Sequence, residues 1–110
     1  MSFVFRHPAF LLKFSDEANC LVLQVQPEKK HVIRCISDQY SWFFDKETGK
    51  LHHVVIGDAY TGIKLDELLY HLQIHSELTK DEIDFVGQLI YQNIASYNPT
   101  RYTQSCAKTH

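Results

Sequence analysis

Hydrophobic residues follow a two-residue rhythm up to about Gly57 and a helical rhythm after it. Within 20–26, for example, Leu21 and Leu23 alternate with residues that would face the other side of a strand. This alternation is typical of strands with one buried face. Strand-like segments cover residues 3–5, 9–14, 20–26, 31–36, 40–44 and 51–56, and His7-Pro8 interrupts the first two. We therefore expect an antiparallel sheet of about five strands.

Two connections suggest hairpins. Residues 27–30 would turn the chain back, and the register that pairs Leu23 with Ile33 keeps Arg34 off the apolar face. The polar loop 45–50 contains Gly49 where a left-handed residue is needed, so it predicts a second hairpin.

Two helices are expected after Gly57. From Ile63 to about His75, the leucines at 65, 68, 69 and 72 form a single stripe. Thr79 and Glu82 have the spacing of a capping box, which predicts the start of the second helix. Its inward stripe would consist of Ile83, Val86, Ile90, Ile94 and Tyr97, widened by Leu89, and Asn98-Pro99 would end it.

These elements predict an α+β fold: an N-terminal antiparallel β-meander of about five strands, with two C-terminal α-helices packed on the sheet. The length of 110 residues suits one domain. We assign residues 1–99 to a single α+β domain and residues 100–110 to a polar C-terminal tail.

Composition supports a globular protein of the cytoplasm. Hydrophobic residues make up 45% and aromatic residues 13% of the chain, enough to build a core. No apolar stretch approaches the roughly 20 residues of a membrane helix, and no secretory signal is recognisable. The odd number of cysteines (Cys20, Cys35 and Cys106) favours free thiols in a reducing compartment.

Charge is unevenly distributed. The net charge is −2, yet residues 51–84 contain two lysines and seven acidic residues. An acidic surface repels nucleic acid, so a general role in DNA or RNA binding is disfavoured. The same surface would attract a basic partner protein, although acidic residues also simply solvate helices.

Seven histidines raise the question of a metal site. His71 and His75 are four residues apart, which places both imidazoles on one flank of a helix. A zinc site would need a third ligand from His52, His53 or Glu67, and the glutamate of the His-Glu-x-x-His motif is missing. A small zinc-binding protein or metal-dependent enzyme is therefore an alternative, and we expect no cofactor otherwise.

The far side of the first helix is unexpectedly apolar, because Ile63, Tyr70 and Ile74 lie about half a turn from the leucine stripe. Either the second helix or the tail buries them, or they form an exposed patch near acidic side chains that resembles a protein-binding hot spot.

No catalytic or nucleotide-binding motif is present, so the sequence favours a protein-binding module without chemistry of its own. Its size and acidity resemble those of stoichiometric inhibitors, such as an immunity protein or antitoxin. The expected partner-binding residues are Tyr60, Asp66, Glu67, Tyr70, Ile74 and Glu77. The same patch could also form a homodimer.

Overall fold

Six antiparallel strands are followed by two helices in the computed structural model, which describes residues 2–26, 31–59 and 62–94. The strands are β1 (Phe3–His7), β2 (Phe10–Ser15), β3 (Cys20–Gln24), β4 (Val32–Ser37), β5 (Tyr40–Asp45) and β6 (Leu51–Gly57). The helices are α1 (Leu65–His75) and α2 (Lys80–Asn93). The predicted α+β class is confirmed, with six strands in place of about five.

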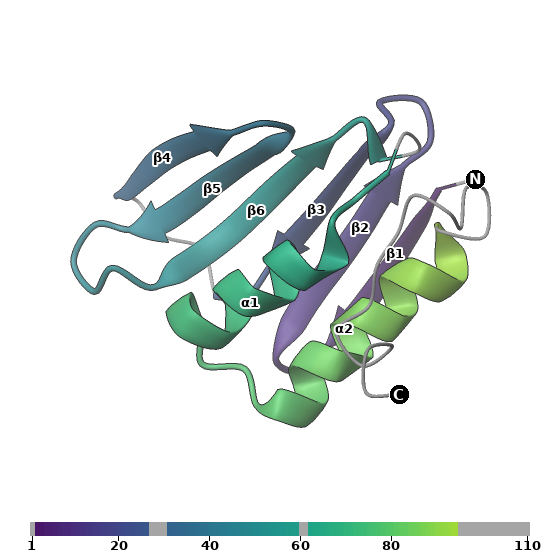
Figure 1. The fold of residues 1–110 in the computed structure, drawn as a ribbon. Coiled ribbons are helices and arrows are strands. Elements are labelled where there is room, and N and C mark those ends of the chain that lie inside the picture. Colours follow the sequence, from purple (N-terminus) through teal and green to yellow (C-terminus); the bar gives the residue numbers. More distant parts are fainter. Residues whose placement is uncertain (1, 27–30, 60–61, 95–110) are drawn as a thin grey trace. The chain divides into compact units, whose positions relative to one another are not determined.

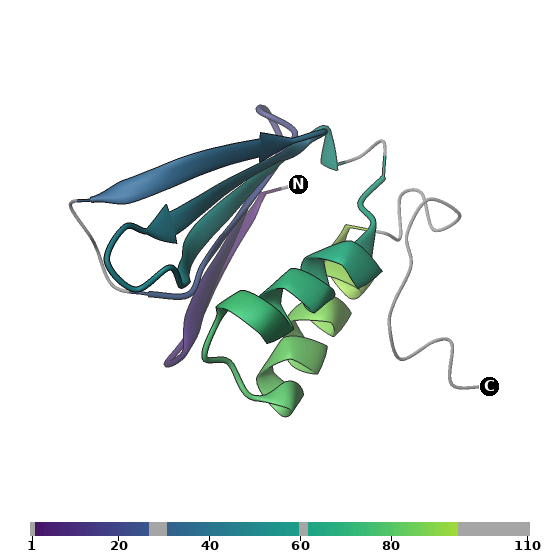
Figure 2. The ribbon, with the colours of Figure 1, turned by 60° about the vertical axis from the view of Figure 1, so that its left-hand side comes forward.

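The sheet has the strand order β1-β2-β3-β6-β5-β4 (Figure 1). It consists of two three-stranded meanders, joined where β3 pairs with β6. The predicted pairing of Leu23 with Ile33 is therefore wrong. Leu23 lies opposite Leu12 and Val54, and Ile33 lies opposite Phe44. The physical reason is that β6, whose side chains are largely buried, takes the place beside β3 and displaces β4 to the edge (Figure 2).

The faces of the strands were predicted correctly even though one neighbour was not. One face of the sheet carries a buried row across four strands, formed by Leu12, Leu23, Val54 and Trp42. Cys35 continues this row on β4, and Arg34 lies on the opposite face in one row with Gln24. The two-residue period fixes these faces whichever strand lies alongside.

The loop between β5 and β6 forms the predicted turn. Gly49 has a φ angle of 74°, in the left-handed region that favours glycine. The Gly49 amide donates a hydrogen bond to the Asp45 carbonyl (2.8 Å), and the Glu47 amide donates one to the Asp45 carboxylate (2.9 Å). These bonds close the turn locally.

The start of α2 shows the predicted capping box. The Glu82 amide donates to the Thr79 hydroxyl (3.2 Å), and the Thr79 amide donates to the Glu82 carboxylate (2.8 Å). Of the predicted inward stripe, the isoleucines and Val86 are buried, and Leu89 is half-buried. Tyr97 and Asn98-Pro99, like the predicted tail at 100–110, lie outside the described residues.

The first helix starts two residues later than predicted. Its N-cap is Lys64, and Gly62 precedes it with a φ angle of 133°. Ile63 therefore lies before the helix, where the helical period does not apply, and its side chain is fully buried. The predicted stripe of Leu65, Leu68, Leu69 and Leu72 is buried as expected.

Backbone contacts divide the chain into two compact units, one up to Asp58 and the other from Ala59 on. In the second unit, α1 and α2 lie side by side and run in opposite directions (Figures 1 and 2). That both helices pack on the sheet in a single domain stays a prediction. Within the described residues, neither helix combines the length and the apolarity that a membrane crossing requires.

Contact between the two helices depends on a glycine. A Cβ atom built on Gly87 would lie 3.0 Å from Leu69 Cδ1, closer than ordinary van der Waals contact. We expect Gly87→Val to lower the free energy of unfolding by about 1–3 kcal/mol, because overpacking forces the helices apart. Urea denaturation followed by far-UV circular dichroism measures this. Gln88→Val, at an exposed position of the same helix, is the matched control, and an equal effect of both variants would contradict the packing argument.

Candidate functional site

Two large apolar side chains lie exposed one turn apart on α1. Tyr70 is 59% exposed and Ile74 is 51% exposed. They are four residues apart, so they lie next to each other on the helix surface. We call this pair the α1 patch. Both interpretations of the apolar far side are thus partly right, because Ile63 is buried whereas the other two side chains are exposed.

Two imidazoles extend the α1 patch. The His71 ring meets the Tyr70 ring edge-on, with centroids 5.6 Å apart, and stacks on the His75 ring at 5.8 Å. Both histidines are half-buried. The patch and its histidines therefore form one continuous surface of flat and apolar side chains, which is the composition typical of binding hot spots.

Acidic residues occupy both ends of α1. Asp66 and Glu67 lie in its first turn, where negative charge interacts favourably with the helix dipole. Glu77 is exposed and follows Ser76, the C-cap residue. The structure thus places five of the six predicted partner-binding residues on or next to one helix. The sixth, Tyr60, lies outside the described residues.

The predicted zinc site has no third ligand among the described residues. His71 and His75 do lie together on α1, as their spacing predicts. Within the described part of the chain, however, no three side chains of His, Cys, Asp or Glu gather in a way that could hold a metal ion. Two imidazoles without a third ligand form an incomplete zinc site.

His52 and His53 form a separate cluster on β6. Their Nδ1 atoms lie 2.7 Å apart, so one imidazole donates a hydrogen bond to the other. Neighbouring residues of a regular strand face opposite sides, but here Phe43 pairs with His53 while Phe44 pairs with Leu51. His52 is therefore the extra residue of a bulge, which allows the two rings to meet.

The sheet also carries a row of mostly polar and aromatic side chains that the sequence does not predict. The His53 ring stacks on Phe43 with centroids 4.1 Å apart, and the Arg34 guanidinium lies 5.8 Å from the centre of the Phe43 ring. The row crosses all six strands as Arg6, Leu11, Gln24, His53, Phe43 and Arg34. No sequence signal could have revealed it, because the row depends on the strand order.

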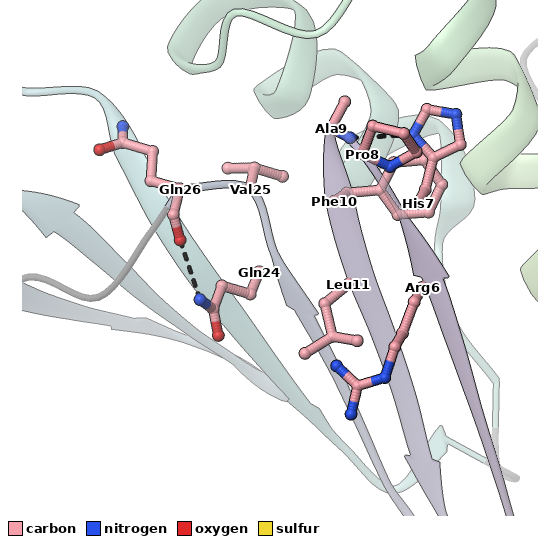
Figure 3. A pocket seen from close by; sticks show the side chains of 9 residues that line it. All are labelled: Arg6, His7, Pro8, Ala9, Phe10, Leu11, Gln24, Val25 and Gln26. Atoms are coloured by element: carbon pink, nitrogen blue, oxygen red, sulfur yellow. Dashed lines mark hydrogen bonds between the residues drawn. The ribbon is translucent and has the colours of Figure 1, made fainter.

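Described residues of the first unit line a smaller and a larger pocket. The smaller, of about 250 Å³, is next to the β1–β2 turn, where Arg6 lies beside Leu11 (Figure 3). Two hydrogen bonds lie within this pocket: the Ala9 amide donates to His7 Nδ1, and the Gln24 side chain donates to the Gln26 carbonyl. The larger, of about 590 Å³, is lined by Val4, Lys13 and Cys20 among others.

The larger pocket contains a partly buried cysteine, Cys20. Burial raises the pKa of the Cys20 thiol above its ordinary value, whereas catalytic cysteines have a lowered pKa. Cys20 and Cys35 are both free thiols. Partial burial and the raised pKa of Cys20 are the opposite of what activates a catalytic cysteine.

Comparisons with protein-family models, with curated proteins and with solved structures found no match for this chain.

The two described thiols should differ in reactivity. Burial raises the pKa of the Cys20 thiol above its ordinary value and thus lowers its thiolate fraction, and it also limits access of a reagent, whereas Cys35 is exposed. We expect iodoacetamide at mildly alkaline pH to alkylate Cys35 several-fold faster than Cys20, and the Cys20 rate to rise with pH. Peptide mass spectrometry follows both sites in one sample. In urea the two rates should converge, and equal rates in the native protein would contradict the argument.

Proposed function

We propose that this protein is a non-enzymatic protein-binding module whose α1 patch binds a basic partner protein. The observation that carries the proposal is the exposure of Tyr70 and Ile74, each with more than half of its surface open. Full burial of an exposed isoleucine contributes about 1.5–3 kcal/mol, so covering the exposed half of Ile74 would contribute roughly half of that. A partner that covers them would recover part of this free energy.

Electrostatics favour a basic partner over a second copy of the same patch. Asp66, Glu67 and Glu77 lie on or near the helix that carries the patch, and Asp66 is four residues before Tyr70. Two copies of the patch facing each other would bring like charges together, which costs free energy when they are close. A partner with exposed lysines or arginines would instead be attracted, and its association would be faster at low salt.

A stoichiometric inhibitor of the immunity-protein or antitoxin kind is the class of binding protein that fits best. This step rests on an analogy of size and charge. The free thiols Cys20 and Cys35 are compatible with action in the reducing cytoplasm. A metal-dependent role has less support, since neither the His71–His75 pair nor the His52–His53 pair has a third ligand among the described residues.

The double variant Tyr70→Ala with Ile74→Ala tests the proposal. Hot-spot residues contribute about 2 kcal/mol or more each, so we expect binding to weaken by roughly 100-fold or more. The fold should persist, because both side chains are exposed. The partner is first captured from the native host and identified by mass spectrometry, and its affinity for each variant is then measured by calorimetry.

Gln73→Ala is the matched control, since Gln73 is an exposed residue of the same helix. This variant should bind as the unmodified protein does. If the double variant retains full affinity for the captured protein, or if it unfolds, then the α1 patch is not the binding surface.

A further inference from the structure

The strand β4 forms an open edge of the sheet and has apolar side chains on both faces. Among the described strands, β4 pairs with β5 alone. Ile33 is 49% exposed on one face and Ile36 is 66% exposed on the other, and Cys35 is also exposed. Natural sheets usually protect such edges, because an unpaired apolar strand is a template for another strand.

The hydrogen-bonding pattern identifies which backbone groups of β4 face the open edge. The Lys46 amide donates to the His31 carbonyl (3.1 Å), so these residues form a hydrogen-bonded pair of the β4–β5 ladder. In an antiparallel ladder every second residue bonds to the same neighbour, so Ile33, Cys35 and Ser37 also bond to β5. The amides and carbonyls of the intervening residues, Val32, Arg34 and Ile36, therefore point away from the sheet.

We propose that β4 pairs antiparallel with β4 of a second copy of this chain and joins two six-stranded sheets into one. The bonding pattern permits few registers, because outward-facing residues of one copy must bond to outward-facing residues of the other. The two registers with the longest overlap place either Arg34 or Cys35 opposite its own counterpart on the symmetry axis. Arginine opposite arginine is destabilising.

The second register avoids directly opposed like charges, because the two Arg34 side chains are diagonal neighbours and lie farther apart. It places Cys35 opposite Cys35 of the second copy, Arg34 opposite Ile36, and Ile33 opposite Ser37, each of these last two pairs occurring twice by symmetry. The cysteines form a non-hydrogen-bonded pair, in which Cα atoms lie about 4.5 Å apart. The β4 edge is thus complementary to itself in this register, and this self-complementarity favours a second copy of the chain as its partner.

The opposite edge of the sheet is less suited to this role. β1 has five residues against the six of β4, and Pro8, which has no amide hydrogen, follows it. Pairing of β4 strands alone makes a small interface, below the roughly 1,200 Å² of stable complexes. The dimer should therefore be weak and should depend on protein concentration.

Two substitutions of one exposed residue test the register. Ile36→Glu would place a carboxylate opposite Arg34 of the second copy, and Ile36→Lys would place an ammonium there. Since each contact occurs twice, we expect the dissociation constant to fall for the glutamate variant and to rise for the lysine variant, by about two- to thirty-fold each. Sedimentation equilibrium across about 10–500 µM, the range of weak interfaces, measures both against the unmodified protein.

Oxidative cross-linking provides a second readout. In a protein with Cys20→Ser and Cys106→Ser, diamide should oxidise Cys35 of two copies to one disulfide, losing one hydrogen from each thiol, while diamide is reduced to the hydrazine. Cross-linking should be faster for Ile36→Glu and slower for Ile36→Lys. Tyr70→Ala with Ile74→Ala should leave it unchanged, because β4 association does not depend on the α1 patch.

Three results would overturn the proposal. In the first, the protein is a monomer at the highest concentration and cross-links slowly. In the second, both Ile36 substitutions weaken dimerisation equally. In the third, the variant Tyr70→Ala with Ile74→Ala no longer dimerises. A fourth result would also contradict it: the isolated chain is monomeric, and a captured foreign protein protects the amides of Val32, Arg34 and Ile36 from hydrogen exchange. The β4 edge would then pair with a strand of that protein and not with a second copy.

Discussion

The pairing of β3 with β6 is the contact on which the sheet depends. It joins the meander β1–β3 to the meander β4–β6, and hydrogen bonds from Val25 and Gln26 to His52 and Leu51 extend the contact beyond the end of β3. It also makes β6 an inner strand, where Leu51, Val54 and Ile56 are fully buried. Because β3 has β2 and β6 as neighbours, β4 is left at the edge. One non-local pairing therefore determines both which strand is protected and which strand is open.

The sequence predicts the faces of the strands better than their neighbours. Side-chain alternation is a local property, so the separation of Arg34 from Cys35 onto opposite faces follows from the sequence alone. The choice of neighbour is not local. The short connection 27–30 favours a hairpin of β3 with β4, since sequential strands usually pair. The burial of β6 outweighs that preference. The hydrophobic pattern of one strand does not show that β4 and β6 compete for the position beside β3.

The candidate site shows the same division. The helical period places Tyr70 and Ile74 on one side of α1, and the spacing of His71 and His75 brings their rings together. Whether those side chains are exposed depends on what packs nearby, which is why Ile63 and Tyr70 differ although both are apolar. The row from Arg6 to Arg34 is even harder to predict from the sequence. Its members come from six strands, and only the completed strand order aligns them.

The two association surfaces differ in the kind of partner that they favour. The proposed α1 patch has acidic residues nearby, which would repel a second copy of the patch and attract a basic protein. The β4 edge has a register in which it complements itself without opposing like charges. The surfaces share no residue, so a dimer formed through β4 would carry two α1 patches. At protein concentrations that favour the dimer, a multivalent partner could bind both α1 patches at once. Its overall affinity would then rise, because the second patch acts at a high effective concentration, whereas the affinity of a monovalent partner would not change.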